Sequence, residues 1–90
     1  DKHRVYVEEQ DAGLTQNEFR LLSLLGKYAG KVLTYDYMMK EIWGPNMKGD
    51  NRILRVNMAN IRRKIEKNPG QPQFIFTEVG VGYRIIETDS

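Results

Sequence analysis

The chain has 90 residues, 40% hydrophobic and 29% charged, with a formal net charge of +2, which suits one soluble globular domain. No apolar run is long enough to span a bilayer and no signal-peptide pattern begins the sequence, so we expect a cytoplasmic protein without a membrane span. It has no cysteine, one histidine near the start (His3) and carboxylates scattered singly, which excludes disulfides and thiolate chemistry and predicts no metal, cofactor or catalytic site.

The first part of the chain predicts a short edge hairpin or strand, followed by a helix. Residues 4–8 alternate between polar and apolar side chains, which is typical of a half-buried strand, and the polar stretch 9–13 predicts a turn. Thr15 and Glu18 have the spacing of a capping box, in which each side chain accepts a hydrogen bond from the backbone of the other residue. A helix over 16–28 is therefore predicted, with an apolar stripe of Phe19, Leu22 and Leu25 and with Leu21 beside it.

A second helix and a loop follow. Residues 31–33 predict a short extended link, after which Thr34 can cap a helix that ends at Trp43, before the Gly44-Pro45 break. Its buried side should consist of Met38, Met39, Ile42 and Trp43. The loop from Gly44 to Asp50 is longer than a minimal helix-turn-helix connection. The residues alone do not distinguish a functional loop from a plain connector.

Residues 51–67 predict an amphipathic helix, which Asp50 or Asn51 can cap. At about 100° per residue, one apolar stripe should face the core, and it consists of Leu54, Met58, Ile61 and Ile65. The outward side collects Arg52, Arg55, Val56, Ala59, Asn60, Arg62, Arg63 and Lys67. The segment holds six Lys/Arg and one Glu, a local charge of 6 − 1 = +5, so the rest of the chain carries −3.

The outward side of this helix indicates a nucleic-acid partner. Positive charge concentrated on one helix is the electrostatic footprint of a surface that binds a polyanion. Val56, Ala59 and Asn60 lie among the arginines, and small apolar or amide side chains suit thymine methyl groups and base edges in a major groove. Taken alone, the same helix would also fit a solvated cationic surface without a partner, so the flanking elements must decide.

The C-terminal part predicts a β-hairpin beside the basic helix. The break at 68–72 is rich in Pro and Gly, and the segments 74–77 and 83–86 flank a turn at 80–82. The order strand, helix, helix, loop, basic helix, hairpin is that of a winged helix-turn-helix, an α+β fold. In this fold the third helix enters the major groove and the hairpin meets the adjacent backbone or minor groove, so the order favours DNA.

Over residues 3–86 the sequence resembles the DNA-binding effector domain of OmpR/PhoB-type response regulators of bacterial two-component systems. The motifs that carry the resemblance are Leu14-Thr15-x-x-Glu18-Phe19, Gly30-Lys31-Val32-Leu33-Thr34, Ile42-Trp43-Gly44, Ile61-Arg62-x-Lys64-Ile65 and Gly80-x-Gly82-Tyr83-Arg84. Within that family, Trp43-Gly44-Pro45-Asn46 and Thr77-Glu78-x-Gly80 look most like the KdpE branch, which controls potassium-transport genes.

The resemblance implies contacts and partners. Phosphate contacts would come from Trp43, Arg52, Arg62, Thr77 and Tyr83, base contacts from Arg55, Val56 and Asn60, and wing contacts from Thr77, Val79 and Gly80. With Ala59 and Arg63 on the outward side of the basic helix, these residues make up the predicted DNA-binding site. The loop of Gly44, Pro45, Asn46, Met47, Lys48, Gly49 and Asp50 would contact RNA polymerase. Two copies would bind head to tail on a direct-repeat operator, and a sensor kinase would act through a receiver domain.

The sequence departs from the family pattern in two places. Fewer residues precede Leu14 than the family's four-stranded N-terminal sheet needs, so we expect a short, truncated N-terminal β-sheet. We also expect one domain, residues 1–90, from a longer regulator whose receiver is absent. Val79 stands where many members have an arginine that enters the minor groove. We predict a sequence-specific double-stranded DNA-binding transcriptional regulator domain that is not an enzyme and is monomeric in isolation. The alternative is a winged-helix module that binds an acidic protein partner.

Overall fold

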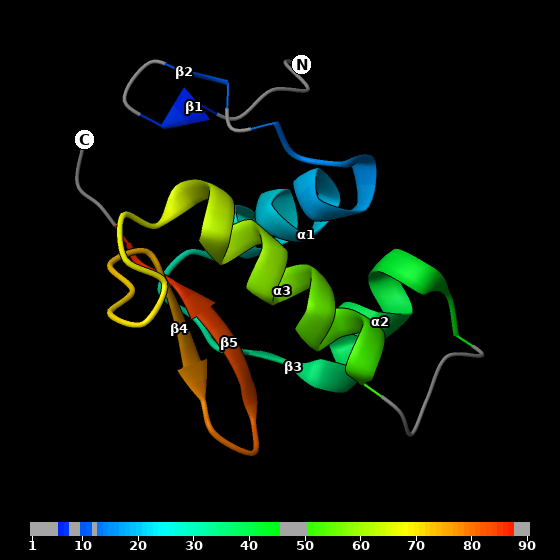
Figure 1. Ribbon diagram of the computed structural model, residues 1–90. Coiled ribbons are helices and arrows are strands. Elements are labelled where there is room, and N and C mark those ends of the chain that lie inside the picture. Colours follow the sequence, from blue (N-terminus) through cyan, green and yellow to red (C-terminus); the bar gives the residue numbers. More distant parts are fainter. Residues whose placement is uncertain (1–5, 8–9, 12, 46–50, 88–90) are drawn as a thin grey trace.

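Three helices and two small antiparallel sheets make up the part of the chain that the computed structural model describes, which is residues 6–7, 10–11, 13–45 and 51–87. The elements are, in chain order, β1 (Tyr6–Val7), β2 (Gln10–Asp11), α1 (Gln16–Lys27), β3 (Leu33–Thr34), α2 (Tyr35–Trp43), α3 (Arg52–Ile65), β4 (Ile75–Glu78) and β5 (Gly82–Ile85). Figure 1 shows α3 crossing the molecule beside the β4–β5 hairpin. The predicted α+β winged-helix fold is therefore confirmed, and we call the β4–β5 hairpin the wing.

The helices begin largely where the capping residues predict. The Thr15 Oγ1 accepts the Glu18 N–H at 3.2 Å, and the Glu18 carboxylate accepts the Thr15 N–H at 3.0 Å, which confirms the capping box. Thr34 caps α2 in the same way, with its Oγ1 at 3.1 Å from the Tyr37 nitrogen. Asn51 precedes α3 without capping it, because its Oδ1 accepts a hydrogen bond from the Arg55 Nε at 3.0 Å instead.

The structure decides between a strand and a hairpin at the N-terminus and adds one strand that was not predicted. Gln10–Asp11 forms β2 and pairs with β1 as a short hairpin, although residues 10–11 were expected in its turn. Leu33–Thr34 forms β3 and pairs with β5, where the sequence predicted only a short extended link. In the resulting sheet of order β3-β5-β4, a Cβ added at Gly82 would lie 1.8 Å from the Leu33 carbonyl oxygen, so a glycine permits this pairing.

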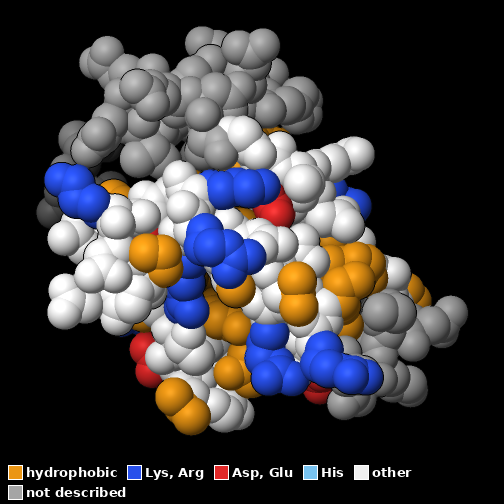
Figure 2. Space-filling model, viewed as in Figure 1, with side chains coloured by type: hydrophobic (Ala, Val, Ile, Leu, Met, Phe, Trp, Pro, Cys, Tyr) orange, Lys and Arg blue, Asp and Glu red, His pale blue; other side chains and the backbone are white. Residues whose placement is uncertain are grey.

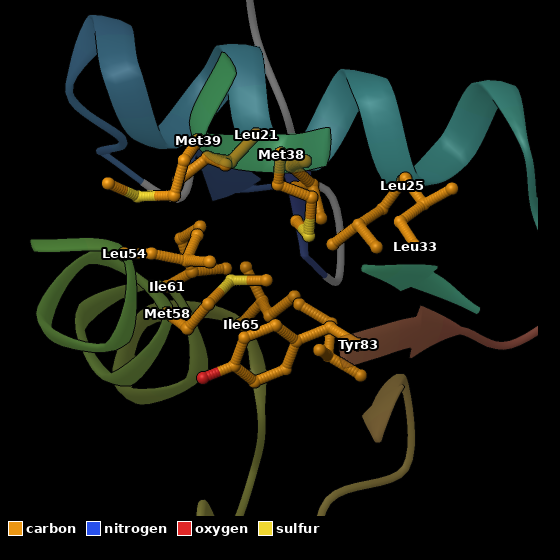
Figure 3. Packing of buried hydrophobic residues seen from close by; sticks show 12 residues of the cluster. Leu21, Leu25, Leu33, Met38, Met39, Leu54, Met58, Ile61, Ile65 and Tyr83 are labelled. Carbon is orange, nitrogen blue, oxygen red and sulfur yellow. The ribbon is translucent and has the colours of Figure 1, made fainter. Parts of the chain in front are cut away.

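The core lies where the three helices meet the inner face of the sheet (Figure 3). The α3 stripe is confirmed, since all four of its predicted residues are buried; the cluster consists of Leu21, Leu22, Leu25, Leu33, Met38, Met39, Leu54, Met58, Ile61, Ile65, Ile75 and Tyr83. On α1 the expected centre was wrong: Leu21 is fully buried, whereas Phe19 is only partly buried. The predicted helix to Lys67 ends at Ile65, because Glu66 has extended backbone angles.

Candidate nucleic-acid interface

The side of α3 that faces away from the core is exposed and basic. Leu54 and Met58 on the inner side are buried, while Val56 between them is 58% exposed. The exposed residues of the helix include Arg52, Arg55, Ala59 and Arg63. Figure 2 shows Lys and Arg side chains gathered over this face of the molecule. The division into a buried and a basic side, predicted from periodicity, is thus present in the structure.

Polar side chains on this face are paired locally. Besides the contact of Arg55 with Asn51, the Arg63 guanidinium donates a hydrogen bond to the Asn60 Oδ1. Asn60 is partly buried, so part of its amide remains open to solvent. Exposed hydrogen bonds contribute little net stability, so a ligand that offers equivalent donors and acceptors can replace them at low cost.

Arg62 brings three predicted phosphate-contact residues into one cluster. Its Nη2 donates to the Thr77 Oγ1 at 2.7 Å and to the Ile75 carbonyl oxygen at 3.1 Å. Its guanidinium lies over the Tyr83 ring, 5.4 Å from the ring centroid. The cluster of Arg62, Thr77 and Tyr83 therefore joins α3 to both strands of the wing. The buried Arg62 Nε has no hydrogen-bond partner among the described residues. The two hydrogen bonds from Nη2 are therefore the ones that fix the position of the guanidinium.

Tyr83 lies in the core instead of on open surface, with only 4% of the residue exposed. Its ring meets Tyr35 edge-on, with the centroids 5.5 Å apart. Burial raises the pKa of the Tyr83 hydroxyl and Tyr35 raises it further, while Arg62 and Arg55 act in the opposite direction. The hydroxyl therefore stays protonated at neutral pH and keeps a proton that it can donate to an anion.

The tip of the wing is the most open part of the predicted site. Val79 is 89% exposed, and Thr77 and Gly80 are also exposed. Gly80 has φ +77°, a left-handed conformation that glycine adopts without strain. Figure 1 shows this tip extending beyond the helices, on the side of the molecule opposite β1 and β2.

Trp43, Gly44 and Pro45 lie at the C-terminal end of α2. Trp43 is partly buried and packs against the core at the end of α2. Gly44 ends the helix with φ +106°, and Pro45 is exposed. The remaining positions of the predicted RNA polymerase loop, residues 46–50, lie outside the described residues.

Two buried carboxylates attach α3 to its neighbours, and the sequence did not indicate either role. Glu18, in α1, pairs with Lys64 Nζ at 2.5 Å. Burial opposes ionisation of Glu18, but the hydrogen bonds and charge of Lys64 and the hydrogen bonds of Thr15 outweigh it and lower its pKa. Glu66, 6% exposed, accepts hydrogen bonds from the backbone at the start of β4. For Glu66, the feature of the sequence that could have indicated its role is that it is the single acidic residue at the end of a strongly basic helix.

Comparison with known proteins identifies the family of this chain. Residues 9–85 match the family model described as "Transcriptional regulatory protein, C terminal". The chain belongs to this family. It is a DNA-binding effector domain of the kind found in OmpR/PhoB-type response regulators, a class of transcriptional regulators and not of enzymes. Among the described residues of this effector domain, no helix is both long and apolar enough to cross a membrane.

Three known proteins illustrate the relationship. The KDP operon transcriptional regulatory protein KdpE of Escherichia coli strain K12 is 42% identical over 82 residues, which are 91% of this chain and 36% of KdpE. Response regulator DrrB, an OmpR/PhoB homolog of Thermotoga maritima, has a TM-score of 0.84 at 30% identity, over 93% of this chain and 38% of DrrB. The RstA DNA-binding domain of Klebsiella pneumoniae, solved with the RstA box, has a TM-score of 0.78 at 26% identity, over 86% of this chain and 76% of that one.

Proposed function

We propose that this effector domain binds double-stranded DNA sequence-specifically, with α3 in the major groove and the wing on the adjacent backbone or minor groove. The observation that carries the proposal is the exposed basic side of α3, whose opposite side is buried in the core. A helix fixed in this way presents its outer residues as one rigid row, and a major groove is wide enough to admit a helix. The RstA DNA-binding domain, which has the same fold, was solved in complex with the RstA box, which supports DNA as the partner.

The residues of the outer side divide into two groups by chemistry. Val56, Ala59 and Asn60 lie along the middle of the exposed side, and we assign them to base edges together with Arg55. Arg52 and Arg63 carry fixed positive charge, which suits phosphate oxygens on either side of the groove. Phosphate contacts position the protein and base contacts specify the sequence, so the two groups have separable effects on binding.

The cluster of Arg62, Thr77 and Tyr83 supplies a second phosphate contact. It combines a guanidinium with two hydroxyls, all of which can donate to a phosphate oxygen. Because it spans α3 and both wing strands, a phosphate bound there would lie between the major-groove and the wing contacts. Trp43 would add an indole N–H donor from the end of α2.

Selection of bound duplexes from a random pool tests the function directly. We expect one enriched sequence, and affinity for it should fall with salt at a slope of about −0.9 per phosphate neutralised. If no sequence is enriched, the domain is better described as a non-specific polyanion binder or as a winged-helix module that binds an acidic protein.

The wider roles rest on the relatives. We propose that two copies bind head to tail on direct repeats, that the loop at 44–50 contacts RNA polymerase, and that a receiver domain under a sensor kinase controls binding. The chain spans 36% of the length of KdpE and 38% of DrrB, so these wider roles are proposed for a longer protein that contains this domain. Control of potassium-transport genes is proposed from the 42% identity with KdpE. A reporter that carries the selected operator, measured in high and low potassium, tests that assignment.

A further inference from the structure

Strand β4 lies at the edge of the sheet, and α3 covers that edge. Among the described residues, β4 pairs with β5 alone. In an antiparallel pair, alternate residues direct their N–H and C=O groups away from the partner strand. The Ile86 N–H donates to the Phe74 carbonyl at 2.7 Å, so this carbonyl faces β5, while the next residue, Ile75, directs both backbone groups outward. Two residues at the C-terminal end of α3, Arg62 and Glu66, bind these outward groups.

Glu66 binds the N–H groups at the start of the strand. Its Oε1 accepts from Gln73 at 2.7 Å, and its Oε2 accepts from Phe74 at 3.0 Å and from Ile75 at 2.9 Å. The carboxylate thus gathers three consecutive backbone donors in a site where the residue is 6% exposed. Hydrogen bonds from neutral donors to a charged acceptor are among the stronger ones in proteins, and this environment excludes most competing water.

Arg62 binds the same strand residue from the other side. It lies in the last turn of α3, four residues before Glu66, which directly follows the helix. The Arg62 Nη2 donates a hydrogen bond to the Ile75 carbonyl oxygen at 3.1 Å, while the Glu66 carboxylate accepts one from the Ile75 N–H. Ile75 is therefore held at both backbone groups, by Arg62 in the last turn of α3 and by Glu66 just after it, and its side chain is fully buried. We call the arrangement of Glu66, Arg62 and Ile75 the α3–β4 clamp.

We propose that Glu66 is a positioning residue for DNA binding, because the clamp fixes the wing relative to α3 and so determines whether both can contact one duplex. This inference rests on the proposed function. The wing tip is exposed on the side away from the clamp, so its position depends on how the base of the hairpin is held. Glu66 itself is buried and does not need to contact DNA to have this effect.

Charge alone predicts the opposite outcome when Glu66 is replaced. Glu66→Gln removes one negative charge from the basic helix, which on electrostatic grounds should tighten binding to any duplex. Loss of positioning should instead weaken binding, and only where the duplex is long enough to reach the wing. The sign of the change therefore separates the two effects.

The experiment uses the duplex that the unmodified domain selects from a random pool, in a full-length form and in a form shortened from the wing side until the salt slope falls by about one. Glu66→Gln should keep its affinity for the shortened duplex within about twofold and lose about fivefold on the full-length duplex. Its salt slope on the full-length duplex should fall to that of the shortened one. Thermal unfolding of each variant establishes that it is folded at the assay temperature.

Two further variants make the result decisive. Glu41→Gln makes the same change of charge at an exposed position on α2 and should show no loss that depends on duplex length. Glu66→Asp keeps the charge but shortens the side chain, and it replaces Glu66→Gln if the latter is unfolded at the assay temperature. The positioning role would be overturned if a folded variant lost affinity equally for both duplexes, or if its ratio of affinities for the full-length and shortened duplexes were unchanged. Failure of the unmodified domain to select any duplex would instead overturn the proposed function.

Discussion

Arg62 combines a structural contact and a proposed DNA contact in one side chain. Its Nη2 is bonded to the Ile75 carbonyl and to Thr77, so replacement by alanine would leave a partly buried strand edge without a donor. A loss of DNA binding in that variant would therefore mix displacement of the wing with loss of charge. Asn60 and Arg52 allow a cleaner test, because Asn60 is hydrogen-bonded to Arg63 on the same helix and Arg52 is an exposed residue in the first turn of α3.

Asn60→Ala and Arg52→Ala should differ in how their effects depend on DNA sequence. Asn60→Ala should cost about 1–3 kcal/mol of binding free energy at particular base pairs, because it removes a bidentate donor and acceptor. Arg52→Ala should weaken binding to all sequences alike and reduce the salt slope by about one. Titration of both variants with the selected duplex and its single-base-pair substitutions measures the difference. Equal losses for Asn60→Ala on every duplex would reject a base-reading role.

Val79→Arg should strengthen binding to sites flanked by A/T tracts. Val79 is 89% exposed at the wing tip, so a longer side chain meets no packing constraint and the fold should be retained. An arginine can follow the negative potential of a narrow minor groove, with a gain of about 1 kcal/mol that shrinks as salt rises. Affinity measured on A/T-flanked and G/C-flanked duplexes at two salt concentrations tests this. Unchanged affinity and salt slope on A/T-flanked sites would mean that the wing tip does not approach the minor groove.

At the scale of elements, the ion pair of Glu18 and Lys64 joins the start of α1 to the end of α3. Because the pKa of Glu18 is lowered below its ordinary value of 4.5, the ionised carboxylate contributes stability above that pH. This contribution is lost as pH falls through the lower pKa of the folded state. Glu18→Gln keeps a capping-box acceptor but removes the charge, so it should cost about 1 kcal/mol at pH 7 and less as the solution becomes acidic. Urea unfolding across this pH range measures the difference; a cost independent of pH would contradict it.

The two wing glycines should respond very differently to substitution by alanine. At Gly82 the added Cβ would lie 1.8 Å from the Leu33 carbonyl oxygen, so β3 and β5 would have to separate. We expect a loss of about 4 kcal/mol or more in the free energy of unfolding. Gly80→Ala meets no atom within 4 Å and should cost about 1–2 kcal/mol, from its left-handed backbone alone. Chemical denaturation ranks the two, and similar costs would show that the strand pairing is not the constraint.

Helices whose apolar residues and caps recur at regular short spacings were predictable from the sequence, whereas contacts between elements were not. The α3 stripe and the caps at Thr15 and Thr34 depend on neighbours three or four residues apart, which the sequence displays. Strand β3 has two residues and exists only because Gly82, far along the chain, lets β5 approach. Glu66 likewise finds its donors seven to nine residues later. The predicted outer residues of α3 could be placed on a face, but the burial of Tyr83 depended on tertiary packing.

At the scale of the whole molecule, we expect the isolated domain to be monomeric at micromolar concentration and to pair only on DNA. Neither α1 nor α3 continues a heptad seam, since each has a single apolar side that is already buried in the core. On a duplex with two direct half-sites, two copies should bind in the same orientation. Sedimentation without DNA and with one or two half-sites checks both expectations. A stable dimer in the absence of DNA would contradict the first.

The covered edge of β4 also bears on solubility. A strand edge with open N–H and C=O groups can pair with another chain, and proteins commonly protect such edges to avoid aggregation. Here Arg62 in α3 and Glu66 directly after it occupy the outward groups of Ile75, so this part of the strand offers no template to a second molecule. The helix that we propose to bind DNA therefore also protects the edge of the sheet. Substitutions on the outer side of α3 that alter DNA specificity are therefore constrained, because a substitution that tilts α3 would expose the edge of β4 to pairing with another chain.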